Sequence, residues 1–185
     1  MVRARAATLV LLDASPFYRF CEAQLLPSLA EYLRGNARVT PEVATELRRG
    51  ARSSRHTGLR YLELAGWPPE TAALPAELQR PFLDYSRAAR QNDELPSKHA
   101  DEITTVLMAA HIGADVVVID DLFGKRLARD RGVPRLSTAQ LAVEMLTEGE
   151  LTAGDGYRVF DLSTPPEAGR ADFTRACDRA GTTRD

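Results

Sequence analysis

The sequence contains few of the residues that build covalent or zinc-linked scaffolds. Cysteine occurs twice, as Cys21 and Cys177, which is too few for a paired-cysteine zinc site and unlike the disulfide framework of a small secreted protein. We therefore expect two reduced thiols in a cytoplasmic protein. The three histidines, His56, His99 and His111, share no ligand spacing, and we expect each of them to be a surface residue.

Long hydrophobic runs and an excess of positive charge are also missing. The N-terminal apolar run ends at Asp13, so it falls far short of the ~20 residues that a membrane-spanning helix needs. We expect no membrane segment. The net charge of −2 gives no general attraction for nucleic acid, so binding to RNA would need a local basic patch. Hydrophobic residues make up 44% of the 185 positions, enough for one domain with its own core.

Two apolar runs end in aspartate. Thr8–Leu12 is followed by Asp13, and Val116–Ile119 is followed by Asp120 and Asp121. Continuous apolar runs of this length are typical of strands buried on both faces, as in a parallel sheet. Since helical patterns lie between the two runs, the sequence predicts an α/β protein with three α/β/α layers around a central parallel sheet.

Helical patterns complete this outline. Ser15 and Pro16 begin the first helix, which we expect to break at Pro27, and Thr40 caps the next helix with Pro41 in its first turn. Residues 1–150 form one predicted domain, in which 52–96 is an inserted helical segment with a helix at 74–89 interrupted at Pro81. Residues 151–185 form a predicted C-terminal extension that is polar and partly disordered. The remaining predicted elements are strands at 38–39 and 133–136, and helices at 100–112, 122–131 and from a Thr138 cap to Leu146.

The aspartates that follow the two apolar runs are candidate metal ligands. If the two strands are neighbours, Asp13 and Asp120 meet at the edge where parallel sheets bind ligands. Crowded carboxylates raise each other's pKa, and a cation relieves the repulsion. Hard oxygen ligands suit Mg²⁺ or Mn²⁺. For each aspartate taken singly, an exposed loop start is the alternative.

Further acidic residues lie at the starts of two predicted helices. Glu46 is on the same helix face as apolar residues, and Asp101 and Glu102 open the helix that leads to the second aspartate-terminated strand. The alternatives are a solvated Glu46 beside Arg48 and Arg49, and favourable interactions of the other two acids with a helix dipole.

The stretches that carry these acids follow one another along the chain in the order Asp13, Glu46, Asp101-Glu102 and Asp120-Asp121. In this order they resemble the four acidic motifs of PIN domains, including VapC-type toxins and their stand-alone relatives. The resemblance covers about residues 7–150, with the middle third unmatched. A closing Gly-Lys-Arg-Leu-Ala-Arg-Asp-Arg-Gly-Val-Pro stretch is also similar to the family. The matching stretches are Leu-Leu-Asp13-Ala-Ser15, Thr-Pro-Glu-Val-Ala-Thr-Glu46, Asp101-Glu102-Ile-Thr-Thr-Val-Leu-Met-Ala and Gly113-Ala-Asp-Val-Val-Val-Ile-Asp120-Asp121.

The resemblance implies a PIN-like fold and a Mg²⁺- or Mn²⁺-dependent endoribonuclease, a hydrolase that cuts RNA phosphodiester bonds. An RNA substrate, an antitoxin protein and a second copy of the chain are the implied partners. It assigns catalytic and metal-binding roles to Asp13, Glu46, Glu102 and Asp120. Asp101 and Asp121 are implied as neighbouring metal ligands, and Ser15 as a supporting hydrogen-bond donor. The candidate RNA contacts, taken from the basic residues near these acids, are Arg48, Arg49, Arg52, Lys125 and Arg126.

Two other readings of the acidic residues remain. One is a non-catalytic PIN-fold module for binding or assembly. The other is an aspartate-based phosphotransfer domain, which needs a lysine on a late strand or a second aspartate two residues after the first. Position 15 is serine and Lys125 falls on a predicted helix, so the sequence lacks both features.

Overall fold

The centre of the fold is a parallel four-stranded sheet. The computed structural model describes residues 4, 7–91, 99–163, 173, 174 and 178. The strand order is β2-β1-β3-β4, and every neighbouring pair is parallel. The predicted α/β class with a parallel sheet is therefore confirmed. The strands are β1 (Val10–Leu12), β2 (Ala37–Arg38), β3 (Val116–Val118) and β4 (Arg135–Leu136).

The two central strands are buried on both faces, as their uninterrupted apolar sequences predict. Leu12 of β1 and Val118 of β3, which pair across the sheet, point into one hydrophobic core. Leu11 and Val117 pair in the same register and point into the other core. Because side chains alternate along a strand, this division requires a helical layer on each side of the sheet.

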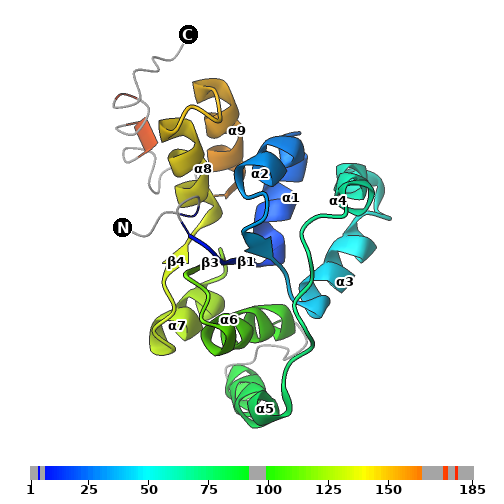
Figure 1. The fold of residues 1–185 in the computed structure, drawn as a ribbon, viewed down its shortest axis with the longest axis vertical. Helices are drawn as coiled ribbons and strands as arrows, with labels where there is room; N and C mark the ends of the chain where they lie inside the picture. Colours follow the sequence, from blue (N-terminus) through cyan, green and yellow to red (C-terminus); the bar gives the residue numbers. More distant parts are fainter. Residues whose placement is uncertain (1–3, 5–6, 92–98, 164–172, 175–177, 179–185) are drawn as a thin grey trace.

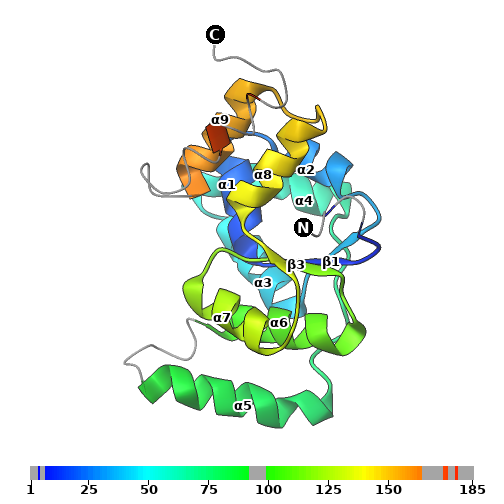
Figure 2. The same cartoon turned by 90° about the vertical axis from the view of Figure 1, so that its left-hand side faces the viewer.

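Helices fill both layers (Figure 1). Within the described residues, no helix is long and apolar enough to cross a membrane. The first layer holds α1 (Ala14–Glu22), α2 (Leu26–Tyr32), α3 (Pro41–Gly50), the 3₁₀ helix η1 (Ser54–Leu59), α4 (Arg60–Ala65), α8 (Thr138–Thr147) and α9 (Ala153–Ser163). The second holds α6 (Ala100–Ile112) and α7 (Leu122–Asp130), with α5 (Ala76–Gln91) packed outside α6 (Figure 2).

Some helix starts differ from the prediction. Asp13, not Ser15, caps α1, and Ser137, not Thr138, caps α8 in a reciprocal arrangement with the side chain of Gln140. The aspartate side chain directly after β1 reaches the free N–H groups of the next turn, which is the usual role of an N-cap. The break between α1 and α2 lies at residues 23–25, so Pro27 stands in the first turn of α2 rather than at a kink.

The middle of the chain is helical, but its details differ from the prediction. Residues 54–65 form η1 and α4, and α5 runs without interruption through Pro81. Leu78, Phe82 and Tyr85 of α5 pack against the core on the α6 side of the sheet. This packing holds a helix that Pro81 alone would weaken. Residues 92–96 of the predicted insertion lie outside the described residues.

Part of the predicted polar C-terminal extension is folded. Helix α9 packs against α8 and α1, and its Val159 and Phe160 are buried. Phe173 is fully buried, with its ring centroid 4.5 Å from that of Phe160 and 4.6 Å from that of Tyr157. Two glycines in α9 lower its helix propensity, so the sequence pattern did not indicate the helix. The rest of the predicted extension, apart from residues 174 and 178, lies outside the described residues.

Candidate metal centre

The first candidate ligand stands where the two central strands end. β1 and β3 are hydrogen-bonded neighbours, and the Asp13 N–H donates to the Val118 carbonyl oxygen over 3.0 Å. The residues that follow the two strands therefore emerge at one edge of the sheet. Helices α3 and α6 also contact each other, and α6 contacts α7, beside this edge. The topology thus brings acidic residues from four parts of the chain into one region.

Asp13 is the most buried of these acids. It is only 4% exposed, and its Oδ2 accepts hydrogen bonds from Ser15 Oγ (3.0 Å) and Ser15 N (3.5 Å). Burial raises the pKa of Asp13 to about 6, the negative charge of Asp101 adds to the increase, and the hydrogen bonds from Ser15 oppose it. The carboxylate therefore sits where an unbalanced negative charge is unfavourable.

Glu46 of α3 faces Asp101 of α6. Burial raises the pKa of Glu46 well above its usual range, and its hydrogen bond with Asp101 and the charges of Asp101 and Asp13 raise it further. Two carboxyl groups that share a hydrogen bond must also share a proton, unless a cation replaces that proton. Tyr18 lies beside this pair, with its hydroxyl 3.5 Å from the Glu46 carbonyl oxygen.

Glu102, one residue after Asp101, faces the same region. The pKa of Glu102 is raised to about 8, mainly by burial. The negative charges of Asp13, Asp121 and Asp101 raise this pKa further. Its Oε2 is buried and has no hydrogen-bond partner among the described residues. We call Asp13, Glu46, Asp101, Glu102 and Asp121 the acidic cluster.

The two aspartates after β3 have different surroundings. Asp120 Oδ1 accepts from Thr138 N over 2.8 Å, and Asp120 Oδ2 is buried with no hydrogen-bond partner within the described part of the chain. Asp121 Oδ1 caps α7 by accepting from Phe123 N (2.7 Å) and Gly124 N (3.2 Å). The charge of Asp121 also acts on Glu102, as noted above. The sequence predicts Asp120 as the main metal ligand after β3 and Asp121 as its companion. In the structure it is the charge of Asp121 that acts on Glu102.

A glycine allows α7 to approach this region closely. A Cβ atom on Gly124 would lie 2.2 Å from Ile119 Cδ1 and 3.3 Å from Glu102 Cβ. Only a residue without a side chain fits this contact without displacing its neighbours. Gly124 therefore helps to set the separation between Glu102 on α6 and the N-terminus of α7.

Sequence reasoning missed His99. Its expected surface location is wrong, since the residue is 3% exposed and its ring lies 4.8 Å from that of Phe123. His99 Nδ1 is 3.9 Å from Glu102 Oε1 and 3.8 Å from Asp121 Oδ1. One ligand atom from each of these three residues lies within 4.8 Å of the others. The i, i+3 spacing of His99 and Glu102 at a helix start was the sequence signal that could have indicated this contact.

The other histidines do not join the cluster. His56 is half-buried and its Nε2 lies 3.1 Å from Glu22 Oε1, while His111 is exposed and lies 4.0 Å from Glu77. The expected surface location therefore holds for His111, and His56 is partly exposed.

The basic residues proposed to contact RNA occupy two surfaces. Arg49 is exposed in the last turn of α3 and Arg52 is exposed just after that helix, while Lys125 (half-buried) and Arg126 (exposed) lie on α7, which Asp121 caps. In the sequence, each of these basic residues therefore follows an acid of the cluster by three to six positions.

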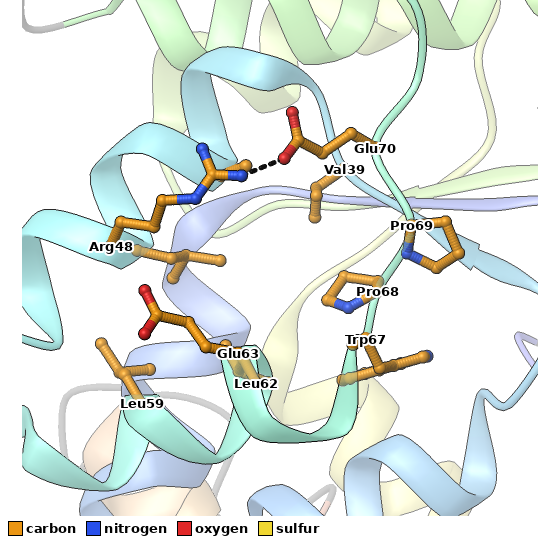
Figure 3. Close-up of a pocket in the computed structure, with 12 residues that line it drawn as sticks. Val39, Arg48, Leu59, Leu62, Glu63, Trp67, Pro68, Pro69 and Glu70 are labelled. Carbon is orange, nitrogen blue, oxygen red and sulfur yellow. Dashed lines mark hydrogen bonds and ion pairs between the residues drawn. The ribbon is translucent and has the colours of Figure 1, made fainter.

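Arg48 faces a separate pocket. It forms an ion pair with Glu70 above a cavity of about 500 Å³ between α3, α4 and the segment 66–70 (Figure 3). Trp67 lines this pocket and packs edge-on against Phe17, with ring centroids 5.8 Å apart. The ion pair compensates the charge of Arg48, so this arginine is a weaker candidate for RNA than Arg49.

Comparison with known proteins does not identify relatives. No family model matches the sequence, and neither the curated proteins nor the solved structures gave a match. The resemblance to PIN domains therefore stays a prediction. The chemical interpretation of the acidic cluster depends on its geometry.

Proposed function

We propose that this chain is a Mg²⁺- or Mn²⁺-dependent endoribonuclease with a PIN-like fold. The observation that carries the proposal is the acidic cluster at the carboxyl edge of a parallel sheet, where burial and mutual repulsion raise the pKa of Asp13, Glu46 and Glu102. Such crowding is unfavourable for a protein without a counter-charge. A divalent cation supplies that charge, and carboxylate oxygens are its preferred ligands.

The residues present fit such an ion. Glu102 Oε2 and Asp120 Oδ2 are buried acceptors that have no hydrogen-bond partner among the described residues. Buried oxygen atoms of this kind normally find a partner, and a hydrated cation provides one. Asp13, Glu46 and Asp101 of the acidic cluster would supply further carboxylate oxygens beside Glu102. Asp13 and Asp121 also cap helices, so they are held in place by backbone hydrogen bonds.

The chain's residues have separate tasks in the proposed reaction. A bound divalent ion lowers the pKa of a coordinated water and stabilises negative charge on phosphate oxygens. Asp13 and Glu102 would hold the ion, Ser15 fixes the orientation of Asp13, and Glu46, whose pKa is raised, would release its proton when the ion binds. No side-chain nucleophile is needed, which agrees with the lack of a Ser-His-Asp or Cys-His arrangement in the sequence.

Basic residues near the cluster would position the substrate. Lys125 and Arg126 follow Asp121 on α7, Arg49 follows Glu46 on α3, and Arg52 lies two residues after the end of α3. Contacts of such residues with phosphates give affinity that does not depend on base sequence. Because the net charge of the whole chain is −2, binding must depend on this local arrangement.

The VapC-type resemblance extends the proposal to a toxin that an antitoxin protein neutralises, acting in the cytoplasm and able to form a homodimer. The same fold without catalysis, as a binding or assembly module, is the alternative. The two differ in one respect that can be measured, because only the nuclease needs the ion for its activity.

Incubation with a long, unstructured RNA tests the proposal. We expect endonucleolytic fragments with Mg²⁺ or Mn²⁺, none with EDTA, and recovery of cleavage when the ion is added back in excess. The readout is the fragment pattern on a denaturing gel. Cleavage that continues in EDTA, or no cleavage of any RNA by protein that binds the ion, would contradict the nuclease and favour the binding module.

A further inference from the structure

We infer that His99 contributes a nitrogen ligand to the metal centre, so that the site selects a first-row transition ion such as Mn²⁺ over Mg²⁺. This inference rests on the proposed metal-dependent function and narrows its cofactor. A carboxylate-only site would accept both ions. The presence of a buried imidazole beside the acids changes the set of ions that the site prefers.

The geometry supports a shared ligand role for His99, Glu102 and Asp121. The imidazole Nδ1 lies 3.9 Å from Glu102 Oε1 and 3.8 Å from Asp121 Oδ1, both longer than a hydrogen bond. An ion about 2.1 Å from each ligand atom would fit between atoms separated by these distances. One ligand atom from each of the three residues lies within 4.8 Å of the others.

Each member of this group is held by other contacts. His99 is 3% exposed and packs against Phe123, which restricts rotation of the ring. Asp121 is fixed by the hydrogen bonds through which its Oδ1 caps α7. Glu102 retains a buried oxygen, Oε2, with no hydrogen-bond partner in the described part of the chain. A pre-arranged set of this kind suits a metal ion better than a mobile surface cluster does.

The type of ligand decides the type of ion. Imidazole nitrogen suits first-row transition ions, whereas Mg²⁺ prefers oxygen ligands and retains most of its water. Two carboxylates and one imidazole therefore favour Mn²⁺ over Mg²⁺. The competing explanation is that His99 is a charged partner of the two acids and plays no part in metal binding.

Electron spin-echo envelope modulation of bound Mn²⁺ tests the inference without an activity assay. We expect modulation from a directly coordinated ¹⁴N in the wild-type protein, replaced by ¹⁵N frequencies when histidine is labelled with ¹⁵N. This version uses the unaltered protein, so it does not depend on the folding of a variant. In His99→Gln, where an amide oxygen replaces the nitrogen, we expect no nitrogen modulation.

Affinity measurements provide a second readout. In His99→Gln the affinity for Mn²⁺ should fall by about 10- to 100-fold, with little change for Mg²⁺. His56→Gln is the matched control, because His56 pairs with Glu22 and not with the acidic cluster, and it should leave both affinities and the modulation unchanged.

The outcomes separate this inference from the proposed function. Mn²⁺ that binds without coordinated nitrogen, or nitrogen modulation that persists in His99→Gln, would overturn the role of His99 and leave a carboxylate metal site intact. Failure of both Mn²⁺ and Mg²⁺ to bind would overturn the inference and the proposed function together.

Discussion

Asp13→Asn should reduce RNA cleavage by at least about 10²-fold, the size of effect seen when one group that stabilises a transition-state charge is removed. Asp13 is buried at the end of β1 and its charge acts on both Glu46 and Glu102. Asparagine has nearly the same shape and remains a good N-cap, so α1 keeps its start. The loss would therefore report the missing charge, as measured by initial cleavage rates with saturating Mn²⁺.

The same variant should be more stable than the wild type when no metal is present. Burial raises the pKa of Asp13 from 3.8 to about 6, so the ionised group destabilises the folded state above that pH. We expect the free energy of unfolding at pH 7.5 to rise by about 1–3 kcal/mol, measured by denaturant unfolding in EDTA. Lower activity with higher stability is typical of a residue kept for function rather than for folding.

Asp115→Asn is the matched control for Asp13→Asn. Asp115 precedes β3 at the opposite end of the strand, where its Oδ2 accepts from Thr8 N, Thr8 Oγ1 and Leu9 N. Its removal should lower stability and leave the cleavage rate of the folded protein unchanged. If Asp13→Asn cleaves RNA at the wild-type rate, Asp13 is not a ligand of a catalytic ion.

The stability of the metal-free protein should fall as the pH rises from 5 to 8. The pKa values of Asp13 and Glu102 are raised to about 6 and about 8, and that of Glu46 is raised too. The folded state therefore keeps protons that the unfolded chain, with ordinary pKa values near 4, has already released. Stability is highest below that ordinary range and is lost as each group ionises in the folded protein.

Denaturant unfolding in EDTA at several pH values measures this loss. A difference of one bound proton changes the free energy of unfolding by about 1.4 kcal/mol per pH unit, so a single proton kept across this window corresponds to about 4 kcal/mol. We expect a total loss of at least about 4 kcal/mol between pH 5 and 8, because more than one group has a raised pKa. Three other acids have lowered pKa values and are already ionised in both the folded and the unfolded state at pH 5, so they do not change the stability within this window. They are Glu22, Asp115 and Asp155. Tyr18, with its pKa raised to about 12, titrates above it.

Addition of Mn²⁺ should remove most of this pH dependence, since the ion replaces the protons. At 100 times the dissociation constant, a ligand that binds only the folded state adds about 2.7 kcal/mol. Glu102→Gln, which removes one of the titrating groups, should flatten the metal-free profile. Equal stability at pH 5 and pH 8 without metal would show that the acids are not crowded in solution.

The sheet and the grouping of acids could be predicted because they depend on local patterns. The apolar runs before Asp13 and Asp120 indicated buried parallel strands, and this arrangement places the residues after them at one edge. Thr40 with Pro41 also marked the start of α3 correctly, and the predicted bounds 100–112 match α6. Each of these features is encoded within a few neighbouring residues.

Other features depend on contacts between distant parts of the chain and could not be predicted. The burial of His99 results from Phe123 on α7, and the pairing of Glu46 with Asp101 results from packing of α3 on α6. Phe173 is buried because it packs with residues of both α8 and α9. The pattern of residues within one segment does not show which distant segment will pack against it.

The central claim is that the acidic cluster binds a divalent ion in place of protons. Calorimetric titration of Mn²⁺ into the metal-free protein at pH 7, repeated in two buffers with different ionisation enthalpies, tests it most directly. Since Glu102 has its pKa at about 8, we expect saturable binding with release of about one proton or more per ion. Binding without proton release, or no saturable binding, would contradict the claim.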